Sequence, residues 1–562
     1  MNKKWELSNV NKEKVNEISI KYGISEVLAT TILNREIDED SIGVFLAPTR
    51  NDFYDPFLMP DMDKAVDRIL TAIKNQEKVI IYGDYDVDGI TSITVMKKFL
   101  MERGLNVDYY VPNRLDEGYG LNKEALQKIK DDGYTLVITV DCGISAISEV
   151  EYANLIGLEI IITDHHEQGE TLPNAYAIVN AKRKDAEYPF RSLAGVGVVF
   201  KVIQAISEKL NLDDKEYLKY LDIVSIGTIS DIVPLISENR VITKLGLRLV
   251  EQTKNIGLQT LIKSIETNKI DSYIVAFRIA PRINACGRLG YEQEAVKLFL
   301  TENVNEAQEI TNKLAEYNSK RQLIEKNIYE DALKKIEEEH INENNTIIIG
   351  GDDWHHGVIG IVASKITEKY GKPTILICFE DDLGKGSGRS IPCFDLHEAL
   401  NKTSKYLEQF GGHALAVGVT LKKENFTNFK KAFEEYASSL ETIKDYIPTI
   451  LIDAVIDKKY LTYEFIDEIK KLEPFGEKNK APIFMYKNLK INSIRTLSEG
   501  KHLKLNLRED NVYIDAIGFN LGSLADEYLI GDKIDVVGTL NVNSYNGYKN
   551  IVIELQDIRK SI

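Results

Sequence analysis

Between residues 78 and 180 the chain repeats one pattern, a short apolar run followed by a Gly/Asp-rich turn and a helical stretch. The runs are rich in β-branched residues and show no polar alternation, which is typical of strands buried on both faces. Because the runs alternate with helices, they predict a parallel α/β sheet with right-handed crossovers. The predicted strands cover residues 78–84, 106–112, 134–141, 158–164 and 175–180.

The hydrophobic pattern changes twice after this sheet. Residues 185–265 are predicted to be mostly helical, and the apolar positions of residues 303–340 recur at helical spacing, which indicates a long connector helix between two lobes. The apolar runs 346–350 and 374–380 then predict a second, smaller α/β unit.

From about residue 450 the apolar residues alternate with polar ones in several short strands, and Asn546-Gly547 predicts a hairpin turn. A small β-barrel is expected here, with an OB-fold as the leading candidate. The expected domains are an N-terminal helical extension (1–45), a catalytic α/β domain (46–265), a connector (266–343), a second α/β domain (344–442) and the barrel (448–562).

Acidic and histidine side chains follow three of the predicted strands. They are Asp84, Asp86, Asp88, Asp141, Asp164, His165 and His166. The carboxyl ends of parallel strands meet at one edge of a sheet, so these groups are expected to lie together. Close carboxylates repel one another unless cations neutralise them. Oxygen and imidazole ligands without a thiolate favour Mn²⁺ or Mg²⁺ before Zn²⁺.

The motifs DYDVDG, VDCG, DHH and SDIVPL, in this order, resemble those of the DHH phosphoesterase superfamily. The resemblance implies two divalent cations, Mn²⁺ preferred and Mg²⁺ possible. It implies metal ligation by Asp86, Asp88, Asp141, His165 and Asp231; taken alone, Asp231 would be an ordinary residue at a helix end. Many members carry a histidine where this chain has Tyr82, so Asp84 is a candidate for that ligand position. His166 is implied to contact the metal or the transition state, and Asp164 to orient the histidines.

Longer segments resemble the RecJ exonucleases of that superfamily, among them VPNRLDEGYGL, APRINACGR, WHHGVIGIVASK, GKGSGRS and QFGGHALAVGV. This resemblance implies that the 5′-terminal phosphate or the adjacent backbone is held by Arg114, Arg282, Ser387 and Arg389, and that His413 lies near the scissile phosphate. GKGSGRS and FGGH are interpreted as Gly-rich turns whose N–H groups point at a phosphate. In the barrel, Lys478 and Lys480 are expected to contact the DNA backbone, and most aromatic residues to serve the core.

The charge balance limits how DNA could bind. The chain has 70 Lys+Arg against 87 Asp+Glu, a formal net charge of −17, so a polyanion must lie in local basic grooves. The N-terminus has no apolar signal segment and no run reaches the roughly 18 apolar residues of a membrane span. The four cysteines form no CxxC pair, as expected in a reducing compartment. These features predict a cytoplasmic protein without a membrane partner.

The resemblance therefore implies a two-metal exonuclease that hydrolyses single-stranded DNA from 5′ to 3′ and releases 5′-mononucleotides, in recombination and repair. We expect a monomer; a single-strand-binding protein and a RecQ-type helicase are partners implied by the resemblance. One alternative is a DHH phosphatase or nanoRNase that acts on very short oligonucleotides, although such relatives lack the barrel. Another is a catalytically silent scaffold, for which degenerate metal motifs would be expected.

Overall fold

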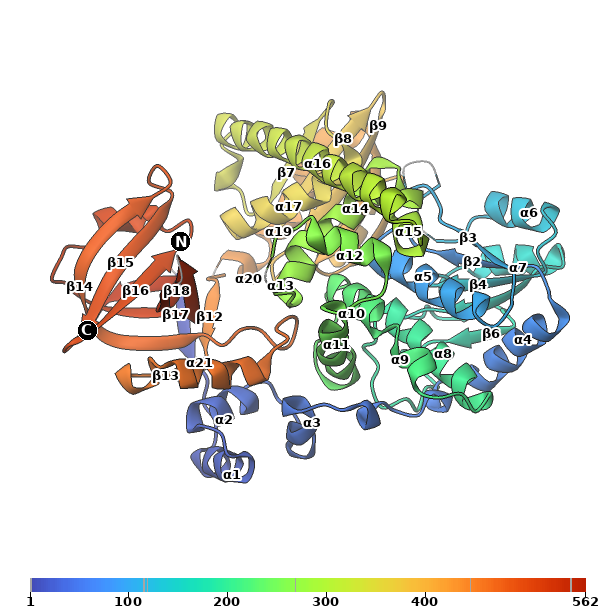
Figure 1. The fold of residues 1–562 in the computed structure, drawn as a ribbon. Helices are drawn as coiled ribbons and strands as arrows, with labels where there is room; N and C mark the ends of the chain where they lie inside the picture. Colours follow the sequence, from blue (N-terminus) through green and yellow to red (C-terminus); the bar gives the residue numbers. More distant parts are fainter. Residues whose placement is uncertain are drawn as a thin grey trace.

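The computed structural model describes residues 3–114, 117–118, 120–267, 269–444, 446–545 and 548–561. The first α/β domain and the C-terminal barrel lie at opposite ends of the molecule, and the long helix α16 runs across the middle, at the top of the view (Figure 1). No helix in the described ranges is long and apolar enough to cross a membrane.

The first sheet is parallel throughout and confirms the predicted α/β architecture. Its strand order is β3-β2-β4-β5-β6. The strands are β2 Val79–Gly83, β3 Val107–Tyr110, β4 Leu136–Val140, β5 Glu159–Thr163 and β6 Ala177–Val179. Every residue of β2 and β4 is buried, as continuous apolar runs require.

Helices cover both faces of this sheet. Alternate strand residues such as Ile81 share a core with α4, α5 and α8, while Ile80 and Tyr82 share a second core with α6 and α7. The helices are α4 Met62–Asn75, α5 Val87–Met101, α6 Lys123–Asp131, α7 Ile147–Leu155 and α8 Gly195–Lys209. More helices follow as predicted: α9 Lys215–Leu218, α10 Leu221–Ser230, α11 Ser237–Val250 and α12 Ile256–Lys263.

The connector ends in one helix of 35 residues, α16 Val304–Glu338. Its first half, with Ile310 and Leu314, belongs to the core of the first sheet, and its second half, with Ile328 and Ile336, to the core of the second sheet. The helix therefore joins the two lobes, as its apolar spacing predicted. Before it lie α13 Ser272–Ile274, the π-helix η4 Val275–Ile279, α14 Ala280–Leu289 and α15 Glu292–Leu300.

The second sheet has the order β10-β11-β9-β8-β7 and corrects one interpretation. The Gly-rich segments predicted as turns are strands. The strands are β7 Ile347–Gly351, β8 Thr374–Glu380, β9 Leu383–Arg389, β10 Gln409–His413 and β11 Ala416–Lys422. A Cβ on Gly384 or Gly386 would lie 2.6 Å from Phe379 or Val419, so close packing of the sheet face explains the glycines. The helices are α17 His356–Tyr370, α18 Leu396–Thr403, α19 Phe426–Ser438 and α20 Glu441–Lys444.

The C-terminal strands close into a barrel, because β14 pairs with both β15 and β17. This confirms the OB-like prediction. The elements are β13 Ala454–Val455, α21 Tyr463–Ile469, β14 Phe484–Leu497, β15 His502–Glu509, β16 Val512–Gly518, β17 Lys533–Tyr545 and β18 Tyr548–Lys560. Phe484 and Tyr486 lie in the barrel core, as expected. The predicted turn residues Asn546 and Gly547 lie outside the described residues.

The N-terminal segment contains a strand that the prediction of a helical extension missed. β1 Lys4–Leu7 pairs in parallel with β12 Thr449–Ile452, ahead of α1 Lys12–Tyr22, α2 Glu26–Leu33 and α3 Ile42–Leu46. Trp5 Nε1 donates to Asp557 at 2.8 Å, so the start of the described chain lies against the barrel. A four-residue strand with a partner this distant leaves no local pattern in the sequence.

Candidate metal centre

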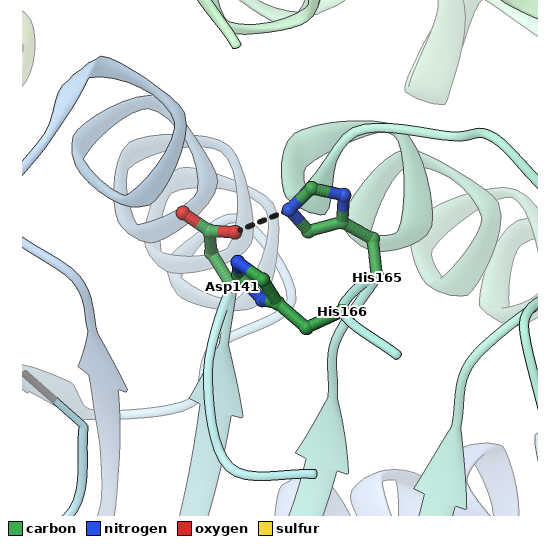
Figure 2. A group of neighbouring side chains, drawn as sticks. All are labelled: Asp141, His165 and His166. Carbon is green, nitrogen blue, oxygen red and sulfur yellow. Dashed lines mark ion pairs between the residues drawn. The ribbon is translucent and has the colours of Figure 1, made fainter. Parts of the chain in front are cut away.

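The predicted acidic groups converge at one edge of the first sheet. Asp84 follows β2, Asp141 follows β4, and Asp164, His165 and His166 follow β5. Figure 2 shows Asp141 and the two histidines pointing toward one another beyond the ends of their strands. The parallel topology thus brings residues distant in sequence to one place.

His165 lies among three carboxylates. Its Nε2 is 3.1 Å from Asp141 Oδ1, 3.6 Å from Asp231 Oδ2 and 3.9 Å from Asp88 Oδ2. Asp231 reaches this point from the C-terminal end of α10, so the fourth predicted motif joins the other three. The centre is therefore assembled from three strand ends and two helix ends.

Asp164 lies behind the histidines and orients them. Its Oδ1 accepts the backbone N–H of His165 at 2.7 Å and lies 2.7 Å from His166 Nδ1. Its Oδ2 accepts the N–H of Ile144 at 2.9 Å. With its oxygens occupied in this way, Asp164 fixes the ring of His166 instead of adding another oxygen to the ligand cluster.

Asp88 is held by the N-terminal end of α8. Its two oxygens accept the N–H groups of Gly195 at 2.6 Å and Val196 at 2.8 Å. A Cβ on Gly195 would lie 2.5 Å from Asp141 Oδ1, so only glycine lets α8 approach the centre this closely. The backbone of α8 thus binds Asp88 and packs closely against Asp141.

The first DxD aspartate caps a helix. Asp86 is the N-cap of α5, and its Oδ1 accepts the N–H groups of Asp88 at 2.9 Å and Gly89 at 3.1 Å. Because Asp84 precedes this cap, the turn holds both carboxylates near Asp141.

The carboxylates are crowded and desolvated. Burial first, and then repulsion by neighbouring carboxylates, raises the pKa of Asp84, Asp141 and Asp231 well above the usual value. The same causes raise the pKa of Asp88 to about 7. Burial and the neighbouring His166 lower the pKa of His165 to about 3. The cluster therefore favours a bound cation over free anions.

The donor atoms fit divalent metals. Three sets of ligand atoms each lie within 4.8 Å of one another, and neighbouring sets share Asp141 or His165. The sets are Asp84–Asp86–Asp141, Asp141–His165–His166 and Asp88–His165–Asp231. Asp84 Oδ1, His165 Nε2 and Asp231 Oδ2 are buried without a hydrogen-bond partner among the described residues. Carboxylate and imidazole donors of this kind suit Mn²⁺ or Mg²⁺.

Tyr82 does not take the ligand position that a histidine would occupy. Its ring is fully buried and stacks on Tyr110 with 5.1 Å between centroids, and its hydroxyl donates to Gly120 O at 2.9 Å. Asp84, by contrast, stands within one of the ligand sets. The local geometry agrees with Asp84 as the replacement.

Three arginines gather beside the acidic cluster. Burial, followed by the charges of Arg114, Arg321 and Arg389, lowers the pKa of Arg288 to about 10, and burial and Arg114 lower the pKa of Arg389. Arg389 Nη1 donates to Ser387 Oγ at 3.1 Å. Arg288 and Arg389 form no ion pair within the described ranges. We call Arg114, Arg288, Arg389 and Ser387 the arginine cluster; it suits an anion.

Arg288 is a candidate that the sequence prediction did not name, although it ends the quoted segment APRINACGR. Its Nη1 donates to Gly357 O at 2.9 Å, which links α14 to the start of α17. Arg282 of the same segment instead donates to Ser264 Oγ at 2.6 Å, and among the described residues it forms no hydrogen bond or ion pair with the arginine cluster. Of the two arginines of this segment, Arg288 is therefore the one that belongs to the arginine cluster beside the metal centre.

The remaining predicted residues lie apart. His413 is exposed at the end of β10, across β11 from Arg389, because His413 pairs with Ala416 and Ala416 pairs with Arg389. Lys478 and Lys480 are exposed before the barrel strands. Lys480 lines a groove of about 1110 Å³ between the catalytic region and the barrel. Ser230 and Ile232, on either side of Asp231, line the same groove.

The fold and the acidic cluster place the chain in the class of DHH-family proteins. The profile of the DHH family, N-terminal domain, matches residues 78–228, and that of the DHHA1 domain matches residues 343–439. The profile of the RecJ OB domain matches residues 452–557.

The relatives narrow the class. The single-stranded-DNA-specific exonuclease RecJ of Bacillus subtilis is 38% identical over 99% of this chain and 70% of its own length. That of Escherichia coli is 31% identical over 88% of this chain and 90% of its own length. The crystal structure of Thermus thermophilus RecJ with Mn²⁺ superposes with a TM-score of 0.87 and 28% identity, covering 100% of this chain and 80% of that one. The chain belongs to the RecJ family.

Proposed function

We propose that the protein is a nuclease that hydrolyses single-stranded DNA from 5′ to 3′ with two divalent cations and releases 5′-mononucleotides in recombination and repair. The names of the relatives support single-stranded DNA as substrate, and the Mn²⁺- and Mg²⁺-bound Thermus structures support divalent metals. The observation that carries the proposal is the set of overlapping ligand groups that share Asp141 and His165.

In this proposal Asp84, Asp86 and Asp141 hold one cation, and Asp88, His165 and Asp231 the other, with Asp141 adjacent to both. Bound cations would activate water and offset the negative charge that develops on the phosphate. A conventional Ser or Cys nucleophile is not required, which agrees with a centre made of carboxylates and imidazoles.

His166 is proposed to contact the scissile phosphate. Asp164 holds its Nδ1, so the opposite side of the ring can face a substrate oxygen. The same hydrogen bond and the charge of Asp164 outweigh the effect of burial and raise the pKa of His166, which favours a ring that donates to an anion. His413 remains a predicted contact near the scissile phosphate, at the same end of the sheet as Arg389.

The arginine cluster is proposed to bind the 5′-terminal phosphate, and this would set the polarity. Guanidinium groups bind phosphate oxygens in pairs, and a cluster of like charges gains most from an anion. Arg114 also stacks on Tyr85, 4.9 Å from the ring, directly after Asp84. A strand end held here would present its first internal phosphodiester to the neighbouring cations.

The groove is proposed to carry the rest of the strand toward the barrel. It is lined by five basic side chains, Lys244, Arg248, Lys269, Lys470 and Lys480, and by five acidic ones, Glu251, Asp271, Glu473, Glu477 and Glu554. It also holds the exposed rings of Tyr273 and Phe277, with centroids 4.8 Å apart, which offer stacking surfaces for bases. The lining is therefore formally neutral, whereas the whole chain carries a net charge of −17.

The chain is predicted to divide into an N-terminal extension, catalytic domain, connector, DHH-associated domain and barrel. We propose that three of these parts share the binding and cleavage of the strand. The catalytic domain would supply the ligand groups, the DHH-associated domain Ser387 and Arg389, and the barrel a hold on the strand. A single-strand-binding protein and a RecQ-type helicase remain predicted partners.

Polarity on a labelled strand tests the proposal. A 5′-phosphorylated strand of about 30 nucleotides is incubated with Mn²⁺, carrying its label at either the 5′ or the 3′ end. We expect a 5′ label to be released at once as a mononucleotide and a 3′ label to remain on progressively shorter strands, with no reaction in EDTA. The reverse pattern, or cleavage in EDTA, would overturn the proposal. Faster turnover of dinucleotides than of the long strand would favour a nanoRNase.

A further inference from the structure

Arg240 on α11 is a buried guanidinium, only 1% exposed, whose partners are all backbone carbonyls. Its Nε donates to Phe45 O at 2.5 Å and its Nη1 to Leu472 O at 2.9 Å. Its Nη2 donates to Lys471 O at 3.0 Å and Glu473 O at 3.1 Å. The guanidinium also stacks on the ring of Phe45 at 3.8 Å. It forms no ion pair in the part of the chain that the structure describes.

These carbonyls belong to two segments outside the catalytic α/β domain. Phe45 lies in α3 of the N-terminal extension, and Leu472 ends the 3-10 helix η9 Lys470–Leu472, which leads toward the barrel. Carbonyls at the end of a helix carry a partial negative charge and lack helical partners, so a cation satisfies them well. Lys244, one turn further along α11, donates to Leu46 O at 3.1 Å and Lys471 O at 2.8 Å. We call Arg240, Lys244 and these carbonyls the carbonyl joint.

The carbonyl joint lies at the wall of the groove. Lys244 of α11 and residues 473–477 line the groove together. Further contacts hold the same segment: Leu235 N–H donates to Glu477 O at 2.9 Å, and Ser272 Oγ donates to Phe475 O at 2.6 Å. The distance between the catalytic domain and the barrel is therefore set where α11 meets residues 471–477.

Burying a cation between two segments carries a desolvation penalty in free energy. Apolar side chains of the same volume would often stabilise such a contact as well or better. A planar guanidinium, however, binds its acceptors only in a defined geometry, whereas apolar contacts tolerate sliding. Four carbonyls on one guanidinium therefore fix the orientation of the segments as well as their contact.

We propose that Arg240, assisted by Lys244, is a positioning residue that holds the barrel in register with the metal centre, so that one single strand spans both. This inference rests on the proposed function. It concerns the path of a long strand, and a dinucleotide, which is too short to reach the barrel, does not depend on it.

Kinetics on two substrates test the inference, with Arg240→Met beside wild type. For a strand of about 30 nucleotides we expect KM to rise about tenfold while kcat changes less than about twofold. On a 5′-phosphorylated dinucleotide both parameters should stay within about twofold of wild type. Arg240→Lys, which keeps the charge but not the fork, should restore part of the loss. Equal losses on both substrates, or none on the long strand, would overturn the inference.

Arg68→Met is the matched control. Arg68 is also a buried arginine, but both its partners, Glu77 and Glu159, lie within the catalytic domain. If loss of stability were the cause of the effect in Arg240→Met, Arg68→Met would show the same selective rise in KM on the long strand. That result would count against the carbonyl joint. Lys244→Met should show a smaller rise in KM on the long strand. This variant replaces Arg240→Met in the test if Arg240→Met does not fold.

A distance measurement separates this inference from the proposed function. Spin labels at the exposed positions Glu124 and Lys501 report the separation of catalytic domain and barrel. The distance distribution should be narrow in wild type and in Arg68→Met and broad in Arg240→Met, whether or not DNA is degraded. An unchanged distribution in Arg240→Met would overturn the joint. Wild type inactive on both substrates would instead refute the nuclease.

Discussion

The acidic cluster and the arginine cluster are neighbouring regions built on opposite charges. In the first, burial and mutual repulsion raise the pKa values of Asp84, Asp141 and Asp231. In the second, burial and mutual repulsion lower the pKa values of Arg288 and Arg389.

The two clusters differ in how they are supported. Asp88 and Asp164 are held by backbone N–H groups of α8 and of the loop after β4, within one domain. The arginines come from separate parts of the chain, Arg288 on α14 and Arg389 at the end of β9. We infer that the acidic cluster is rigid before cations bind. We also infer that a bound anion bridges α14 and β9 and so holds the arginine cluster together.

The largest expected effect comes from breaking the acidic cluster. Asp141→Asn removes a charge shared by two ligand sets, so exonuclease activity with Mn²⁺ should fall by at least about 10³-fold. Asp132→Asn, at the exposed end of α6, serves as control and should retain full activity. Substantial activity in Asp141→Asn would show that the cluster is not the catalytic centre.

The support from α8 is tested next. In Gly195→Ala the added methyl would lie 2.5 Å from Asp141 Oδ1, so we expect Mn²⁺ affinity, measured by calorimetry, to fall by about 10–100-fold. Gly197→Ala, two residues along the same helix, meets its nearest neighbour at 3.4 Å and should bind Mn²⁺ as wild type does. Equal affinities in the two variants would argue against the close approach of α8.

The arginine cluster should discriminate strand ends. Wild type is expected to prefer a 5′-phosphate over a 5′-hydroxyl, and Arg288→Met should reduce that ratio of kcat/KM by about tenfold. Arg282→Met, whose guanidinium binds Ser264, should leave the ratio unchanged. If Arg282→Met alone removes the preference, the phosphate site contains the residue predicted from sequence instead of Arg288.

The smallest expected effect is a change in how thermal stability depends on pH when metal is bound. Without metal, folding favours the protonated form of Asp88, whose pKa is raised to about 7, so its stabilising contribution is present at low pH and lost as the pH rises through that value. Melting of the chelated protein should fall by about 2–4 °C between pH 6 and 8, and Mn²⁺ should flatten this slope. A chelated protein that gains stability over this interval would contradict the desolvated cluster.

Local patterns explain what the sequence could predict. The buried runs of the first sheet, the spacing of α16 and the alternation in the barrel are properties of neighbouring residues, and the structure confirms them. The convergence of Asp84, Asp141 and Asp164 also follows from parallel topology, because each comes directly after a strand.

The features that were missed depend on tertiary contacts. The glycines of β9 resembled a turn because the packing of Phe379 and Val419 that requires them is invisible in the sequence. Arg282 and Arg288 lie six residues apart on α14, so they point about 120° apart around the helix axis, and only the neighbours of α14 decide which one joins the arginine cluster.

Anomalous diffraction from crystals grown with Mn²⁺ would show whether the acidic cluster holds two cations beside the arginine cluster. We expect two peaks about 3.5–4 Å apart, one on Asp84, Asp86 and Asp141 and the other on Asp88, His165 and Asp231. A single peak, or peaks elsewhere in the molecule, would contradict this expectation.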